Sequence, residues 1–331
     1  MKKLLLSAAL CALLSSTAVA DNMAINLPTP TSGIRQAARL TVDETVLGIT
    51  RGSGSNWINV ERSFTMAAWI KVNGKSTLFG GQALMGHQAQ DHVNYNGSFF
   101  LSIPSGATAF TLTGKTGSGA VTYNETSSTE YTTDDWHYYA MVYDADELTM
   151  TLYIDGESTA VKTFSSYAQL FPDNPGVLFF GNATSHTTVD DAQIFSKALT
   201  QDEVKTAMSD PQAVGDLDCY YTFDEVLDGT TGQFENHGSL KDVKAMYLIG
   251  SGSADGSGVI SCGSNHTESA PELVESRSTV GIDGINADLT EEDPSSVRFY
   301  NLQGMEVSSD NLTSGLYIRK SNAKVQKVLV K

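Results

Sequence analysis

A stretch of seven residues with strictly alternating polarity constrains the fold of this chain more than any other feature. In the run 148–154 every second residue has a large aliphatic side chain, and these residues are Leu148, Met150, Leu152 and Ile154. The residues between them are two threonines and a tyrosine. A period of two places all four aliphatic side chains on one face of a β-strand, whereas a helix would spread them around its axis. We therefore expect a strand with one face in a hydrophobic core.

Segments of the same kind surround this run. Trp136–Asp144 is rich in β-forming residues, and Asp144–Glu147 joins it to the alternating run as a hairpin connection. Asp155-Gly156 then ends the run with a dipeptide suited to positive φ. Further strands are expected over Phe64–Val72, Ser98–Ile103, Ala107–Thr113, Val177–Gly181, Val189–Phe195 and Cys219–Asp224. Many short strands, separated by turn residues at intervals of about ten residues, predict an all-β sandwich or barrel.

One short helix is expected among these strands. Thr200 is placed to be its N-cap, and Glu203 completes a Thr-x-x-Glu capping box three residues later. Leu199 and Val204 stand at the two positions of a hydrophobic staple. Because Pro211 cannot continue a helix, the helix should end shortly before it.

Residues 1–20 have the pattern of a secretory signal peptide. A basic start at Lys2-Lys3 is followed by the apolar stretch 4–14, which is too short to span a bilayer. Ala18-Val19-Ala20 then offers the small residues that signal peptidase reads, with cleavage before Asp21. No later stretch approaches the roughly 18 apolar residues of a membrane span. The sequence thus predicts a secreted protein, extracellular or on the outer cell surface, without a transmembrane segment in the mature chain.

The composition changes after residue 249. Residues 250–258 contain only Gly, Ser, Ala and Asp, which is typical of a flexible linker, and the chain stays polar to residue 296. Three compact strands are then expected over Val297–Asn301, Leu316–Arg319 and Val325–Val330. We therefore divide the mature chain into a β-sandwich over 21–249, a linker over 250–296 and a small C-terminal β-domain over 297–331.

The charge of the chain excludes one class of partner. Lys and Arg number 21 against 38 Asp and Glu, which gives a formal net charge of -17 at pH 7. Binding to nucleic acid depends on clustered Lys and Arg that neutralise phosphates, so we expect no nucleic-acid partner.

Two cysteines remain once Cys11 is removed with the signal peptide. In an oxidising compartment Cys219 and Cys262 are a candidate disulfide. The alternative is two independent buried thiols. No second cysteine pair and no histidine is arranged around them as a zinc site would need.

Four phrases of the body, in this order, resemble the laminin-G-like, concanavalin-A-like jelly-roll family. They are Phe64–Lys71, Trp136–Asp144, Leu152–Gly156 and Val189–Thr200. Leu-Tyr-Ile-Asp-Gly at 152–156 matches the family pattern without a departure, whereas Gln193 stands where Arg is usual and Tyr138 where a second His is usual. The resemblance covers roughly Ile25–Phe223, and it implies a concanavalin-A-like β-sandwich of the jelly-roll kind.

The same resemblance implies a structural calcium site. In several relatives an Asp at the start of the corresponding strand binds Ca²⁺ together with backbone carbonyls, and the matching residue here is Asp190. Carboxylate and carbonyl oxygens are the ligands that Ca²⁺ prefers. The alternative is that Asp190 caps a turn or faces solvent. Since neighbours on a strand alternate, Asp191 should point to the other face of the sheet.

The C-terminal strands resemble a second family, the sorting domain read by the type IX secretion system of certain Gram-negative bacteria. The phrases that carry this resemblance are Val297–Gly304, Gly315–Ile318 and Lys324–Lys331. It implies export across the outer membrane, with the export machinery as a partner. The alternative is an ordinary small β-domain.

No recognisable catalytic motif appears in the sequence. Glucanases of this fold carry two glutamates in an E-x-D-x-(x)-E pattern, and the glutamates of the body lack this spacing. His87 and His92 are possible metal ligands, but their polar surroundings favour a solvated loop. We expect His137 to be structural, and Trp69 and Trp136 to fill the sandwich core.

These observations favour a non-catalytic binding module, with a carbohydrate or a cell-surface glycoprotein as its partner. The alternatives are a glycan-active hydrolase or lyase with an unrecognised site on the same sandwich, and a structural adhesion component. A binding module should show exposed aromatic side chains on loops around one face or rim, such as Tyr95, Tyr123 or Tyr131. An enzyme should show two carboxylates about 5–10 Å apart in a cleft.

Overall fold

A computed structural model of the chain divides into two compact units, residues 1–276 and residues 277–331. The structure describes residues 22–28, 39–47, 50–51, 58–59, 62–74, 81–89, 99–104, 109–115, 121–130, 132–165, 176–182, 186–224, 233–248, 271–277, 298–300, 306–308, 315–320 and 325–330. The first unit contains two large sheets, and the second contains one small sheet.

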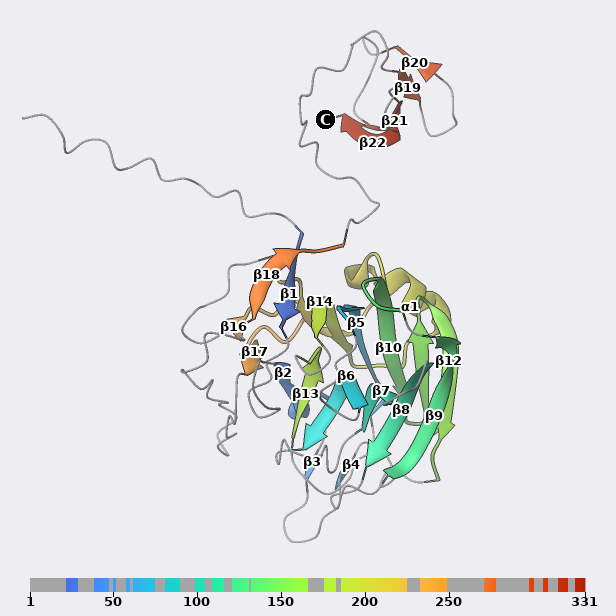
Figure 1. Cartoon of the computed structure of the whole chain (residues 1–331), viewed down its shortest axis with the longest axis vertical. Helices are drawn as coiled ribbons and strands as arrows, with labels where there is room; N and C mark the ends of the chain where they lie inside the picture. The colour runs from blue at the N-terminus through green and yellow to red at the C-terminus, as the bar shows by residue number, and fades with distance from the viewer. Residues whose placement is uncertain are drawn as a thin grey trace, which may run out of the picture. The chain divides into compact units, whose positions relative to one another are not determined.

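The first large sheet, which we call sheet A, is antiparallel. Its strands are β1 (Met23–Leu27), β5 (Phe64–Val72), β10 (Trp136–Asp144), β11 (Thr149–Ile154), β12 (Glu157–Thr163), β14 (Thr187–Phe195), β15 (Leu217–Tyr221) and β18 (Glu272–Glu275). They follow the order β12-β11-β10-β5-β14-β1-β18, and β15 also pairs with β14 (Figure 1). Strands from both ends of the unit therefore meet at one edge of the sheet.

The second large sheet, sheet B, is also antiparallel. Its strands are β2 (Arg39–Asp43), β6 (Gly81–Ala89), β7 (Phe99–Pro104), β8 (Ala109–Lys115), β9 (Val121–Glu130), β13 (Gly176–Phe180), β16 (Gln233–Phe234) and β17 (Ala245–Leu248). They follow the order β16-β17-β2-β13-β6-β7-β8-β9. The 3₁₀ helix η2 (Glu44–Leu47) follows β2, and β3 (Thr50–Arg51) pairs with β4 (Ile58–Asn59) as a separate two-stranded sheet.

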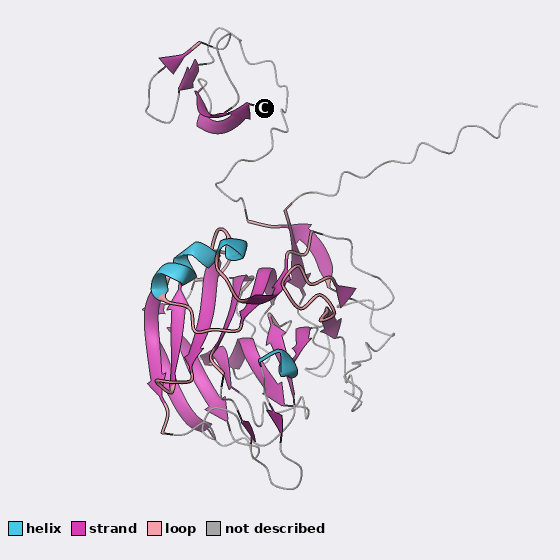
Figure 2. Cartoon of the chain, turned by 180° about the vertical axis from the view of Figure 1, so that it is seen from behind, coloured by secondary structure: helices cyan, strands magenta, loops and turns pink. Residues whose placement is uncertain are grey.

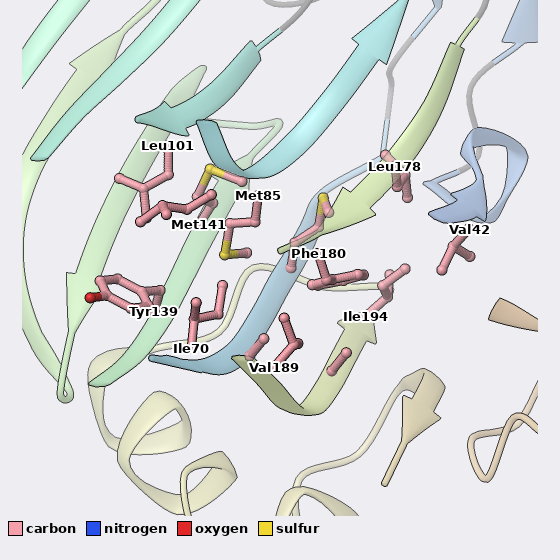
Figure 3. Packing of buried hydrophobic residues seen from close by; sticks show 14 of the residues in the cluster. Val42, Ile70, Met85, Leu101, Tyr139, Met141, Leu178, Phe180, Val189 and Ile194 are labelled. Atoms are coloured by element: carbon pink, nitrogen blue, oxygen red, sulfur yellow. The ribbon is translucent and has the colours of Figure 1, made fainter. Parts of the chain in front are cut away.

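The two sheets pack face to face over a single hydrophobic core. Sheet A contributes Ile70, Tyr139, Met141, Val189 and Ile194, and sheet B contributes Val42, Met85, Leu101, Leu178 and Phe180 (Figure 3). Alternation along each strand supplies these side chains, as the burial of β11 shows with buried residues at every second position. The core therefore confirms the β-sandwich that the alternating run 148–154 predicts.

Helix α1 (Gln201–Ala207) covers part of the outer face of sheet A (Figure 2). The predicted capping box is present: the Thr200 side chain accepts from the Glu203 N–H, and the Glu203 carboxylate accepts from the Thr200 N–H. Leu199, Val204 and Ala207 pack against outer-face residues of β5, β10 and β14 as a second apolar cluster. The 3₁₀ helix η5 (Pro211–Ala213) follows, so the chain turns at the predicted proline.

The predicted hairpins around β11 are confirmed. Residues 145–148 form the turn between β10 and β11, and Asp155-Gly156 forms the turn between β11 and β12. Asp155 and Gly156 have φ values of 51° and 79°, which is the left-handed conformation that a two-residue hairpin turn requires. The register of β11 with the edge strand β12 therefore depends on this dipeptide.

Several described strands lie outside the ranges expected from the sequence, among them β1, β2, β6, β9, β16, β17 and β18. Strand β18 lies inside the range 250–296 that we assign to a linker, and its residues pair with β1 as part of the sandwich. Strand β9 is absent from the predicted strands because eight of its ten residues are polar, so no apolar alternation marks it. Strand β6 includes His87, which the sequence places in a solvated loop. Residues 1–20 and most of the predicted linker lie outside the described residues.

The second unit contains a four-stranded antiparallel sheet. Its strands are β19 (Arg298–Tyr300), β20 (Glu306–Val307), β21 (Gly315–Lys320) and β22 (Val325–Val330), in the order β20-β19-β21-β22. Three of the four coincide with the strands expected from the sequence. Within the part of the chain that the structure describes, no helix is long and apolar enough to cross a bilayer.

Cys219 is a free thiol in strand β15, and its side chain is fully buried in the main core. Burial raises the pKa of this thiol to about 11, although hydrogen bonds with Tyr221 and Asn236 oppose the change. Cys262, its predicted disulfide partner, lies outside the described residues. The structure therefore does not confirm the disulfide, because the sulfur of Cys219 packs among core side chains instead of bonding to a second sulfur.

We predict that Cys219 resists alkylation in the folded protein. With a pKa of about 11, only about one thiol in ten thousand is a thiolate at pH 7, and the folded core excludes reagent. Iodoacetamide labelling followed by peptide mass spectrometry should find Cys219 unmodified in the native protein and fully modified in guanidinium. The same digest, kept unreduced, also tests the disulfide. A cross-linked peptide that contains Cys219 and Cys262 would show that the disulfide forms and would contradict this prediction.

Candidate functional site

Five residues form a continuous row on the outer face of sheet A, beside helix α1. They are Trp136 of β10, Lys71 of β5, Thr188 of β14, Asn26 of β1 and Glu272 of β18, and we call them the polar row. Each is the direct cross-strand partner of the next, so their side chains leave the same face of the sheet. The residues two positions along β5 and β10 are Trp69 and Tyr138, which lie in the apolar cluster with the helix. The polar row is thus the part of this face next to that cluster.

Side-chain hydrogen bonds connect the polar row at its β1 end. The Asn26 amide donates to Glu272 Oε1 at 2.8 Å, and the Thr188 hydroxyl donates to Asn26 Oδ1 at 3.3 Å. Asn73, just after β5, donates from Nδ2 to Thr188 Oγ1 at 2.7 Å. These amide and hydroxyl groups are therefore held in fixed positions by one another, while Asn26 and Asn73 stay partly exposed.

An aromatic ring and a cation occupy the β10 end of the row. Lys71 Nζ lies 5.5 Å from the centroid of the Trp136 ring, which is within the range of a cation–π interaction. Both side chains are partly exposed. The prediction that Trp136 fills the sandwich core is therefore wrong: it starts its strand on the outer face. Trp69 is also outside the main core, and its Nε1 donates to the carbonyl of Met208, the residue that ends helix α1.

Loops at the ends of three strands frame the row. The Asn73 N–H donates to the His186 carbonyl at 2.7 Å, and the Asp134 N–H donates to the Val72 carbonyl at 2.8 Å. Asp134 and His186 have φ values of 68° and 46°, so both loops turn sharply at these residues. Burial lowers the pKa of His186; Asp134 opposes this effect and Lys71 adds to it.

Asp190, the predicted calcium ligand, lies on the same face in the next row of residues. It is buried, its Oδ1 accepts from the Asp191 N–H at 2.7 Å, and its Oδ2 accepts from the Ser276 hydroxyl. Asp190 therefore connects β14 to the chain directly after β18. Among the residues that can be described, no group of three or more His, Cys, Asp or Glu side chains is placed to hold a metal ion.

Asp191 does not follow the alternation that we expect of it. A β-bulge between Asp190 and Gln193 adds one residue to β14, and Asp191 has a φ of 47°. Its carboxylate accepts from the Tyr220 hydroxyl at 2.7 Å, and Tyr220 is the cross-strand partner of the outer-face residue Gln193. The bulge thus explains why neighbouring side chains do not simply alternate here.

His137 connects the start of β10 to the turn between β11 and β12. Its Nδ1 lies 2.7 Å from Asp155 Oδ2, and its Nε2 lies 2.8 Å from the Thr132 hydroxyl. Asp155 Oδ1 also accepts from the Tyr138 N–H at 2.9 Å. The hydrogen bond to Asp155 raises the pKa of His137, and partial burial opposes this increase. These contacts agree with the structural role that the sequence predicts.

The structure corrects two other sequence-based expectations. His87 is fully buried in β6 rather than in a solvated loop, with its Nε2 2.5 Å from Glu44 Oε2 and its ring stacked on Phe99. Tyr123 is buried in β9, where its ring lies over Gly114 and contacts Phe164, so it is not an exposed loop aromatic. His92, Tyr95 and Tyr131 lie outside the described residues.

The polar row is not predicted from the sequence. Lys71 follows Trp69 by two residues in the predicted strand Phe64–Val72, so alternation alone would place both on one face. The order of the strands, which brings Asn26 and Glu272 beside Thr188, is not visible in the sequence.

We predict that protonation of His137 stabilises the fold. Because Asp155 raises its folded-state pKa above the ordinary 6.5, this contribution is fully present below pH 6.5 and is lost as the pH rises through the folded-state pKa. Thermal unfolding should therefore show a larger decrease in Tm from pH 6 to pH 8 for the wild type than for His137→Asn. Parallel pH profiles for the two proteins would show that the ion pair contributes nothing. Histidine NMR titration measures the pKa itself.

The comparisons with solved structures find distant similarity. A candidate carbohydrate binding protein of Bacteroides ovatus is 17% identical, with a TM-score of 0.42 over 68% of this chain and 58% of that chain. A SAP-like pentraxin of Limulus polyphemus is 13% identical, with a TM-score of 0.39 over 57% of this chain and 82% of that chain. The CBM40 module of a Ruminococcus gnavus sialidase, solved with α2,3 sialyllactose, is 14% identical, with a TM-score of 0.34 over 44% and 82%.

The comparison with family models identifies the superfamily of residues 49–205. No curated protein matches the sequence. A family model described as the Concanavalin A-like lectin/glucanases superfamily matches residues 49–205. This range includes three residues of the polar row, Lys71, Trp136 and Thr188, and the central strands of both sheets. Residues 49–205 therefore form a domain of the Concanavalin A-like lectin/glucanases superfamily.

Proposed function

We propose that this protein is a secreted carbohydrate-binding module and that the polar row is its binding surface. The observation that carries the proposal is the partly exposed Trp136 ring at one end of a ladder of amide and hydroxyl side chains on neighbouring strands. The superfamily of the domain, which is named for lectins and glucanases, supports a glycan as the partner.

The chemistry of the polar row suits a sugar. A pyranose ring presents a face of C–H groups, which stacks on an aromatic side chain, and a rim of hydroxyls, which both donate and accept hydrogen bonds. Trp136 provides the aromatic face. Asn26 and Asn73, which are partly exposed, provide amide groups that donate and accept in the same way, and the buried Thr188 hydroxyl holds both amides in place. Because β-strands hold these groups at fixed spacing, little side-chain entropy is lost when a glycan binds.

The proposal includes export from the cell. The signal-peptide pattern over residues 1–20 and the resemblance of residues 297–331 to type IX sorting domains support it. The second unit has its own four-stranded sheet, which is compatible with a separate sorting domain. The secretion machinery would then be a second partner, recognised through residues other than the polar row.

We predict that Trp136→Ala weakens glycan binding. Loss of stacking on an aromatic ring should lower the affinity by about fivefold or more, because such a ring contributes about 1 kcal/mol or more to binding. The measurement is a glycan-array screen of the full chain, followed by calorimetry with the best ligand. Val161→Ala is the matched control, because Val161 is 52% exposed on β12, at the opposite edge of sheet A.

Two outcomes of this screen would contradict the proposal. The first is that the wild type binds no glycan, and the second is that Trp136→Ala binds as tightly as Val161→Ala. Product analysis of the bound glycans distinguishes binding from cleavage, since a glycan-active hydrolase or lyase would shorten them.

We also propose, from the family resemblance, that Asp190 contributes to a structural Ca²⁺ site. An ion that binds only the folded state stabilises it by about 2.7 kcal/mol at a hundredfold excess over Kd. EDTA should therefore lower the Tm of the full chain, and Asp190→Asn should remove this sensitivity. Asp202→Asn, on the exposed side of α1, should leave it unchanged. If EDTA does not change the wild-type Tm, the calcium proposal is wrong and Asp190 has a purely structural role.

A further inference from the structure

Among the described residues Lys71 has no carboxylate partner, although most described basic side chains of the sandwich have one. Five basic residues each lie within 3.0 Å of an acid: Arg62 with Asp218, Lys162 with Glu125, Lys197 with Glu203, Lys205 with Glu157 and Lys244 with Glu235. Among the described residues no carboxylate oxygen lies within 4.0 Å of Lys71 Nζ. Lys241 also lacks an acidic partner in the described part of the chain, but it donates to the His237 carbonyl and is exposed away from the polar row.

The surroundings of Lys71 hold this charge inside the proposed binding surface. Its neighbours across the sheet are Trp136 on β10 and Thr188 on β14. The ammonium lies over the Trp136 ring and stays partly exposed. Any molecule that stacks on Trp136 beside the amides of Asn26 and Asn73 must therefore approach this cation.

The acidic side chains around the row have contacts of their own. Glu272 accepts from the Asn26 amide at 2.8 Å, and Asp134 lies close enough to His186 to affect its pKa. The Lys71 ammonium thus has three N–H donors, and no acid among the described residues accepts a hydrogen bond from them. An ionised acceptor on a ligand would form a charge-assisted hydrogen bond here, which is about twice as strong as a neutral one.

We propose that the glycan bound by the polar row carries an anionic group, a carboxylate or a sulfate, and that Lys71 binds that group. This inference rests on the proposed glycan-binding function and adds the chemical class of the ligand. Carboxylate and sulfate share the charge and the acceptor oxygens that Lys71 needs. Neutral glycans of the same backbone lack this contact and bind more weakly.

The test compares matched pairs of glycans against the full chain by calorimetry. Galacturonan is paired with its methyl ester, 3′-sialyllactose with lactose, and 3′-sulfolactose with lactose. The anionic member of a pair should bind about tenfold more tightly or better, and the difference should shrink as salt is raised. The first two pairs report on a carboxylate and the third on a sulfate.

Substitutions assign the preference to Lys71. Lys71→Gln should remove the difference within each pair, and Lys71→Arg should keep it. Lys162→Gln is the matched control, because Lys162 pairs with Glu125 at the edge between β12 and β9. Equal binding within all pairs, or a preference that survives Lys71→Gln, overturns the inference while the glycan-binding function stands. If neither member of any pair binds, and the array finds no other glycan, the proposed function fails as well.

Discussion

The pairing of β5 with β10 on one side and β14 on the other is the interaction on which the rest of the structure depends. Both faces of β5 are used: Phe64, Met66, Ala68 and Ile70 enter the main core, whereas Ala67 and Trp69 pack under helix α1. Burial of both faces fixes the register, because a shift by one residue would exchange the two sets of side chains. The same register places Lys71 between Trp136 and Thr188, so the candidate site follows directly from the pairing that builds the core.

Helix α1 decides where a ligand has access to this face. Its apolar side covers Tyr138 and Phe195, and the Met208 carbonyl at its end accepts from Trp69 Nε1. On the same face, the cross-strand pair that follows Trp69 and Tyr138 is Lys71 and Trp136, and both of these side chains are partly exposed. Two residues along a strand are about 6.6 Å. The change from covered core to accessible polar surface therefore takes place within a single repeat of the strand.

Local patterns predicted the central strands and the helix, whereas strands such as β1, β2, β6, β9 and β18 and the contacts between distant elements were not predictable from them. The ranges of β5 and β10, the Thr200 cap and the Asp155-Gly156 turn each have a local physical signal in the sequence. Strand β9 has no such local signal in the sequence. It is stabilised by contacts with neighbouring strands, such as the packing of Tyr123 over Gly114. The polar residues next to His87 in the sequence favoured a solvent-exposed side chain. Its burial depends on the contact with Glu44, which is 43 residues away in the sequence. Asn26 and Glu272 are 246 residues apart, so no local pattern could join them to Lys71.

The two strands from the ends of the first unit link the proposed binding surface to the stability of the sheet edge. Strand β18 pairs only with β1 in sheet A, so its position depends on few backbone contacts. Ser276, just after it, donates from its hydroxyl to Asp190 and from its N–H to the Asn22 carbonyl. Asn26 and Glu272 belong to these same strands and hold each other across them. A ligand that contacted both Asn26 and Glu272 would bridge β1 and β18 and stabilise their pairing by its own binding free energy. Asp190 links the same edge from within the protein through its hydrogen bond from Ser276, so the proposed calcium site and the proposed glycan surface share one structural element.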